Sequence, residues 1–160
     1  MNNSTKSLSI GLSGLRSILF IAANLALPYF FHLVPGGGIA FLPIYWFTLV
    51  GVMRYGLLTG VSAAAMSPLV GFLLFGAPAS AMLPDMLLKG ILLCVAAAVT
   101  VRLWGIRIHS AAVAVVAAWA VAGLVEWPFT GAAYAFQDFV TGIPGLVLMS
   151  VVATLIAKRL

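Results

Sequence analysis

The sequence predicts an all-α integral membrane protein, a compact bundle of six transmembrane helices with cytoplasmic N- and C-termini. Of the 160 residues, 64% are hydrophobic and 7% are charged, whereas a soluble domain has about 45 to 50% apolar and about 25% charged residues. Pro, Gly and charged residues divide the apolar sequence into six segments. No segment shows sustained polar and apolar alternation, which disfavours a β-barrel, so the spans are expected to be helices.

The predicted elements follow from the positions of these Pro, Gly and charged residues. Residues 1–16 are polar and Ser-rich and form an expected cytoplasmic leader, and residues 17–160 form one transmembrane domain. The segment after the leader is interpreted as an uncleaved first helix, since five more spans follow it. Several segments are shorter than the about 20 residues that span a bilayer comfortably, so their limits carry errors of several residues. The six helices are expected at about 17–34, 39–53, 56–75, 83–101, 110–127 and 139–157.

The basic residues predict the orientation. With a cytoplasmic N-terminus, all of them except Lys89 fall at the cytoplasmic side: Lys6, Arg16, Arg54, Arg102, Arg107, Lys158 and Arg159. This distribution agrees with the positive-inside rule. The net charge of +5 therefore orients the chain in a bilayer and does not indicate a nucleic-acid partner. The same orientation places residues 35–38, 76–81 and 126–138, with all three acidic residues, at the outer side.

Asp85 and Lys89 are four residues apart in an otherwise apolar helix and are expected on one face. Pro84 suits a first helical turn, which puts Asp85 near the positive end of the helix dipole. One interpretation is that Asp85 caps the helix and neutralises a lysine that extends towards the interface. The other is that both side chains face a water-filled outer pocket and contact a zwitterionic or polar solute.

A second polar cluster occupies residues 126–138. Its side chains combine aromatic faces with hydrogen-bonding groups, a combination typical of small-molecule sites: Glu126, Trp127, Tyr134, Gln137 and Asp138. The alternative is an interfacial aromatic belt followed by a solvated loop. Because Glu126 and Asp138 share the predicted outer side with Asp85, we expect this cluster to contribute to one substrate site together with Asp85 and Lys89.

The first predicted helix carries a pair of small residues, Ala22 and Ala26, at a spacing that lets another helix approach closely. Chance or packing within the chain is the alternative, because alanine is abundant. Asn24, between them, is expected to hydrogen-bond either across a helix interface or to its own backbone.

Catalytic and cofactor motifs are weak, and we expect neither an enzyme nor a cofactor. The GLSG string at 11–14 places Ser13 in the polar leader, away from any shielded active site. His32 and His109 fall at opposite sides of the predicted membrane, and Cys94 has no partner thiol, so no metal site is expected. The sequence also lacks a phosphate-binding G-x-x-x-x-G-K-[ST] loop, so energy for uphill transport would come from a partner or an ion gradient.

These features together resemble the substrate-binding S components of energy-coupling factor (ECF) vitamin transporters. The resemblance covers nearly the whole chain: its length, six helices, termini inside, the A-x-x-x-A motif at Ala22 and Ala26, and SPLVGFLLFGAPASAMLPDMLLKG at 67–90. That segment is similar to the family's serine-proline, leucine-rich, glycine-x-proline and leucine-proline pattern. Residues 70–72 and 76–79 depart from the methionine-proline-proline turn and its preceding polar residues in many relatives, so no particular vitamin is predicted.

The resemblance implies a high-affinity subunit of a bacterial cytoplasmic membrane that captures a vitamin or related micronutrient from outside. It implies that Ala22 and Ala26 face a transmembrane coupling protein, and that two ATPase subunits complete the transporter. Asp85 and Lys89 are expected as charge partners of the solute. A structural scaffold protein of the cell-shape machinery is the rival interpretation, and it would hold no solute.

Overall fold

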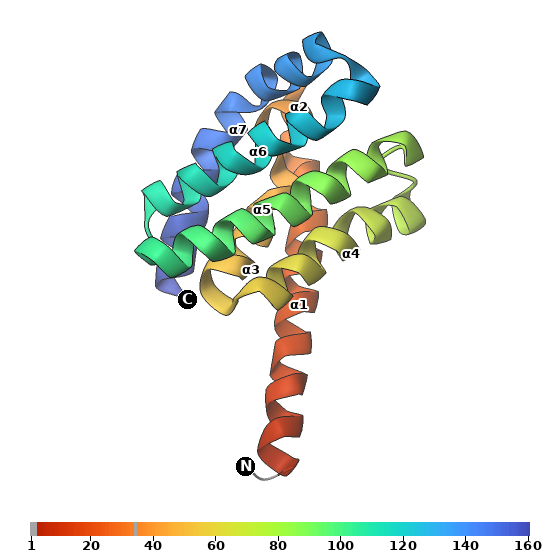
Figure 1. Cartoon of the computed structure of the whole chain (residues 1–160). Coiled ribbons are helices and arrows are strands. Elements are labelled where there is room, and N and C mark those ends of the chain that lie inside the picture. Colours follow the sequence, from red (N-terminus) through yellow and green to blue (C-terminus); the bar gives the residue numbers. More distant parts are fainter. Residues whose placement is uncertain (1–2, 34) are drawn as a thin grey trace.

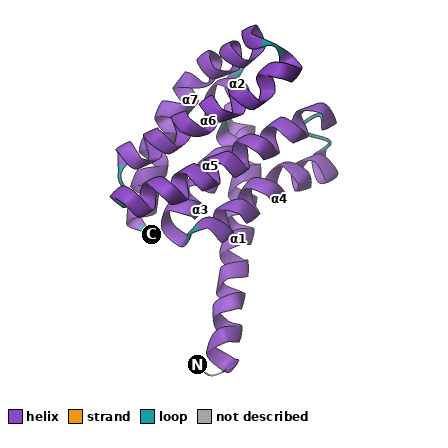
Figure 2. Cartoon of the chain, in the orientation of Figure 1, coloured by secondary structure: helices purple, strands orange, loops and turns teal. Residues whose placement is uncertain are grey.

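A computed structural model describes the backbone of residues 3–33 and 35–160, and side chains from residue 14 onwards. The leader's side chains up to residue 13, and with them the Ser13 alternative, lie outside this part, and the division at residue 16 stays a prediction. Throughout the described residues the regular elements are helical (Figure 1, Figure 2). Six helical segments among them are long and apolar enough to cross a membrane, which confirms that part of the predicted fold.

Most helix ends lie beyond the predicted segments, whereas the first helix ends before residue 34 and the helix expected from residue 56 begins one residue later. Their bounds are α1 (Asn3–Phe31), α2 (Gly37–Phe41), α3 (Trp46–Tyr55), α4 (Leu57–Phe75), α5 (Leu83–Trp104), α6 (Ile108–Thr130) and α7 (Ala132–Arg159). Short 3-10 turns occupy Pro43–Tyr45 and Ser80–Met82. α1 begins at Asn3, so the polar leader is helical along most of its length. The cytoplasmic placement of the termini stays a prediction.

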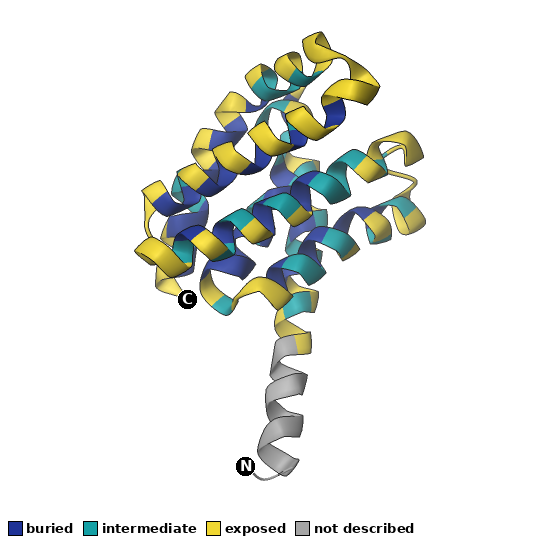
Figure 3. Ribbon diagram, in the orientation of Figure 1, coloured by how far each residue is buried: buried dark blue, intermediate teal, exposed yellow. Residues whose placement is uncertain are grey.

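Helix α3 lies at the centre of the bundle and contacts α1, α4, α5 and α7. Around it, α4, α5, α6 and α7 contact one another in sequence order (Figure 1). The fully buried side chains between them include Leu49, Leu93, Trp119 and Met149. Large apolar side chains such as Leu73 and Phe129 are instead exposed, as is expected of a protein surrounded by lipid. Exposed residues, yellow in Figure 3, lie along the outward faces of the helices.

The second predicted span is not one continuous helix, which corrects the expectation for residues 39–53. α2 ends at Phe41, Leu42 takes a left-handed conformation with φ of 51°, and Pro43 begins the 3-10 turn that leads into α3. Proline has no backbone N–H to continue a helix. The indole N–H of Trp46 donates a hydrogen bond to the Phe41 carbonyl at 2.8 Å, so one carbonyl freed by the break has a partner.

The expectation of an outer loop over residues 126–138 was wrong. α6 continues to Thr130 and α7 starts at Ala132, so a single residue, Gly131, makes the connection. Its φ of 87° is a value that glycine adopts without the steric cost other residues meet. Glu126 is therefore on the last turns of α6 and Asp138 on the second turn of α7, both held by helical backbone.

Candidate functional site

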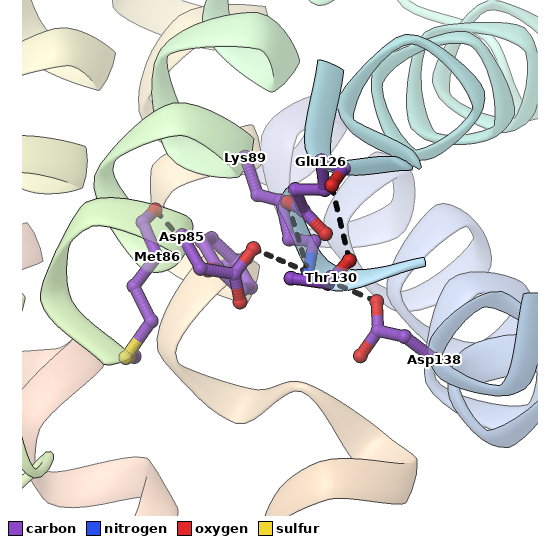
Figure 4. A network of polar contacts seen from close by, with 7 residues as sticks. Asp85, Met86, Lys89, Glu126, Thr130 and Asp138 are labelled. Atoms are coloured by element: carbon purple, nitrogen blue, oxygen red, sulfur yellow. Dashed lines mark hydrogen bonds and ion pairs between the residues drawn. The ribbon is translucent and has the colours of Figure 1, made fainter. Parts of the chain in front are cut away.

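Lys89 stands at the centre of the site, with its side chain 4% exposed (Figure 4). Its ammonium lies 2.5 Å from Asp85 Oδ1, 2.9 Å from Asp138 Oδ2 and 3.5 Å from Glu126 Oε1. These three carboxylates are all the acidic residues of the chain. They come from α5, α6 and α7, so the network joins three helices through one buried cation.

Local structure explains how each group reaches this point. Pro84 lies in the first turn of α5, as predicted, and the one-turn spacing of Asp85 and Lys89 lets them pair on one face. The tight turn at Gly131 sets the start of α7 beside the end of α6, which brings Asp138 to the same place as Glu126. Thr130 closes the last turn of α6 by donating a hydrogen bond to the Glu126 carbonyl at 3.1 Å.

A cavity of about 490 Å³ adjoins this network. Asp85, Lys89 and Asp138 form its charged wall, and most of the remaining lining is apolar or aromatic. A volume of about 300 to 1,000 Å³ with a few convergent polar groups is typical of small-molecule sites. The cavity lies at the end of the bundle that holds the α4–α5 connection (Figure 1), and Ala77 and Pro78 of that connection line it.

The broken second span supplies another wall of the cavity. Leu42, Pro43, Ile44 and Tyr45 all line it. Irregular backbone at membrane depth is tolerated where it is buried in protein or faces a cavity, and both conditions hold here. The Tyr45 hydroxyl donates a hydrogen bond to the Met86 carbonyl on α5 at 3.2 Å, and this bond ties the break to the helix that carries Lys89.

Asn24 also lines the cavity, and its amide is engaged within the protein. Its Nδ2 donates to Thr48 Oγ1 at 2.9 Å and to Ser67 Oγ at 3.3 Å, and its Oδ1 accepts from the Phe47 backbone N–H at 3.0 Å. Asn24 is fully buried. Of the two roles expected for it, the structure shows hydrogen bonding across helices, from α1 to α3 and α4.

The remaining residues expected at the site are exposed on α6 and α7. Trp127 and Tyr134 are each 55% exposed, and Trp127 borders a second hollow of about 410 Å³ between these helices. Gln137 is exposed and donates to Thr141 at 3.1 Å. The structure therefore brings Glu126 and Asp138 to Lys89 and leaves these three residues outside the cavity lining. Ala22 and Ala26 are exposed on α1.

Sequence reasoning missed several residues of the cavity wall, notably His32, Leu42, Tyr45 and Met86. The proline at position 43, inside an apolar segment, is the signal that indicates them, because interrupted membrane helices often border binding sites. In the part of the chain that the structure describes, no group of three or more His, Cys, Asp or Glu side chains is arranged to hold a metal ion.

Comparisons with protein-family models, with curated proteins and with solved structures gave no match for this chain.

Proposed function

We propose that this protein is the substrate-capture subunit of an ECF-type importer for a vitamin or related micronutrient. The observation that carries the proposal is the cavity of about 490 Å³ with Asp85, Lys89 and Asp138 in its wall. Keeping four ionisable side chains inside a membrane bundle is costly, since each buried ion loses several kcal/mol of hydration. A role in solute binding accounts for that cost and for the space beside the charges.

The charge distribution gives the proposed direction of capture. With the basic ends of the helices cytoplasmic, the cavity opens towards the outer side. The chain contains no phosphate-binding loop. In the proposed mechanism a separate coupling protein and two ATPases move the loaded subunit, and the residues described here only bind and release the solute.

The proposal is tested by identifying what the cavity holds. The protein is purified in detergent after growth in rich medium and denatured, and the released small molecules are identified by mass spectrometry. Met86→Trp places a large side chain in the cavity from α5 and leaves the backbone carbonyl that Tyr45 contacts. Val95→Trp is the matched control, because Val95 is on the same helix, 49% exposed and outside the cavity lining.

We expect one metabolite, near one molecule per protein, in the wild type and in Val95→Trp, and a large loss in Met86→Trp. Equal release from all three proteins would place the metabolite elsewhere. A wild type that carries no metabolite would contradict a capture function and favour the scaffold interpretation. Copurification with wall-synthesis proteins would strengthen that second reading.

The proposed coupling surface is the exposed row of α1 that contains Ile18, Ala22 and Ala26. Its small residues would let a helix of the coupling protein approach closely. Changing Ala22 and Ala26 together to Leu is expected to abolish copurification of the coupling protein and ATPases from host membranes without loss of bound metabolite. Ala117→Leu, at an exposed position of α6, is the control and retains the partners.

A further inference from the structure

The charges around the cavity are unbalanced. Three carboxylates surround one ammonium group, so the cluster has a formal charge of −2 when all four groups are ionised (three negative, one positive). Among the ion pairs of the described residues, Lys89 is the basic partner of all three carboxylates. The excess negative charge is therefore a property of the cluster itself.

The hydrogen-bonding capacity is unbalanced in the same sense. An ammonium group has three N–H donors, whereas three carboxylates offer six acceptor oxygens. Glu126 is 9% exposed, and its Oε1, 3.5 Å from the Lys89 ammonium, has no hydrogen-bond partner among the described residues. Buried carboxylate oxygens are normally satisfied, so this site lacks donors.

The exposure of the groups decides which charge a ligand can reach. The Lys89 side chain is 4% exposed, and carboxylates from three helices surround its ammonium. The Asp85 and Asp138 side chains are 31% and 21% exposed and line the cavity. A solute in the cavity therefore meets carboxylates before it meets the ammonium group.

We propose that the solute of this cavity is an organic cation, a molecule with a protonated amine on a mainly apolar body; this inference rests on the capture function proposed above. Its amine donates hydrogen bonds to Asp85 and Asp138 and supplies positive charge that the cluster lacks. A carboxylate in the same place would add a fourth negative charge in a low-dielectric setting. The apolar body lies against the aromatic and aliphatic wall, which includes the edge-to-face pair of Tyr29 and Phe75.

Three indole compounds with the same two-carbon arm test this proposal: tryptamine, tryptophol and indole-3-propionate, which carry an amine, a hydroxyl and a carboxyl group. Near pH 7 the amine is protonated and the carboxyl group is ionised. Binding to the purified protein in nanodiscs is measured by calorimetry up to about 10 mM ligand, with thermal shift as a second readout. We expect tryptamine to bind at least about tenfold more tightly than tryptophol, and indole-3-propionate to bind most weakly.

Variants of two adjacent residues test whether the preference for tryptamine arises from the carboxylates of the cavity wall. Asp138→Asn keeps a side chain that accepts a hydrogen bond from Lys89 but removes one negative charge, so it is expected to reduce the preference for tryptamine at least about fivefold. Gln137→Glu adds a carboxylate at an exposed position outside the cavity lining and is expected to leave the preference unchanged. Asp85→Asn replaces Asp138→Asn if that variant does not fold.

Equal binding of the three compounds, tighter binding of indole-3-propionate, or no tryptamine binding at the highest concentration would overturn the cation proposal. A retained metabolite that carries only carboxylates would also overturn it while the capture function stands. A wild type that purifies without any metabolite counts against the capture function, and the indole series then decides the charge preference by itself.

Discussion

Among the described residues, two clusters of buried polar side chains differ in charge and in how fully their hydrogen-bonding groups are paired. The first is centred on Asn24 and consists of neutral groups on α1, α3 and α4. The Asn24 amide both donates and accepts hydrogen bonds in this cluster, at 2.9 to 3.3 Å. The Ser67 hydroxyl donates a further hydrogen bond to the Ala63 carbonyl at 2.6 Å. The second is centred on Lys89, consists of ions, and has more acceptors than donors.

This difference separates a packing role for the Asn24 cluster from the binding role that we propose for the Lys89 cluster. Asn24 accepts from the Phe47 N–H in the first turn of α3, a group that cannot bond within its own helix, so the first cluster fixes α1 against the start of α3. Satisfied polar networks make a buried interface specific. The Lys89 cluster also joins helices, but it has acceptor oxygens in excess of its donors and lies at the cavity wall. In the proposed function, a ligand donates hydrogen bonds to these remaining acceptors.

The largest expected effect is that of Lys89→Met, which removes the cation and leaves three carboxylates together. Removing one partner of a buried ion pair costs about 3 to 5 kcal/mol of stability. We expect a loss of that order in thermal or detergent-induced unfolding of the purified protein. Lys158→Met, at an exposed position in the last turn of α7, is the control and is expected to cost under about 1 kcal/mol.

A fourfold variant sharpens this result. Combining Lys89→Met with Asp85→Asn, Glu126→Gln and Asp138→Asn removes every charge of the cluster, and most of the lost stability is expected to return while metabolite binding does not. If Lys89→Met alone were as stable as the wild type, the ion pairs of Lys89 with the three carboxylates would not contribute to the stability of the bundle.

Changes in the neutral cluster are expected to lower stability by less than Lys89→Met does, and Thr48, which is outside the cavity lining, is expected to affect stability alone. Asn24→Leu leaves the Phe47 N–H unpaired in the protein interior, at a cost of about 1 to 3 kcal/mol. Thr48→Val removes only one of the three hydrogen bonds and is expected to cost about 0.5 to 1.5 kcal/mol, with metabolite release per protein molecule unchanged. A Thr48→Val protein that folds but holds no metabolite would remove the distinction between the two clusters.

The sequence predicts the local parts of this arrangement well. Six spans follow from apolar length, and the position of Asp85 and Lys89 on one helix face follows from their one-turn spacing after Pro84. That they pair with each other is shown only by the structure. Alternating spans also put the other acids at the same predicted side. What the sequence does not provide is the distance between helices, so the convergence of Glu126 and Asp138 on one ammonium group emerges only from the tertiary structure.

The incorrect predictions at 126–138 and 39–53 have a common physical cause. The effect of a proline or a polar group on a helix depends on which neighbouring groups can pair with the free backbone. The polar and aromatic residues of 126–138 indicated a loop, yet α6 continues through Pro128 to Thr130, and Gly131 alone connects it to α7. Pro43 lies in an apolar run that indicated a continuous helix, yet the chain breaks there and Trp46 supplies a donor to the freed Phe41 carbonyl. Membrane helices tolerate proline where neighbouring groups restore the hydrogen bonds, and those neighbours are tertiary.

The smallest expected effect distinguishes adjacent residues of α7. Gln137 is exposed and bonds only to Thr141 within its own helix, as far as the described contacts show, whereas Asp138 pairs with Lys89 at 2.9 Å. Gln137→Ala is therefore expected to change stability by no more than about 0.5 kcal/mol, since it alters an exposed surface position. Metabolite release should stay at the wild-type level, whereas Asp138→Asn lowers it. A loss of metabolite from a folded Gln137→Ala protein would mean that the solute contacts the exposed face of α7, because Gln137 is outside the cavity lining.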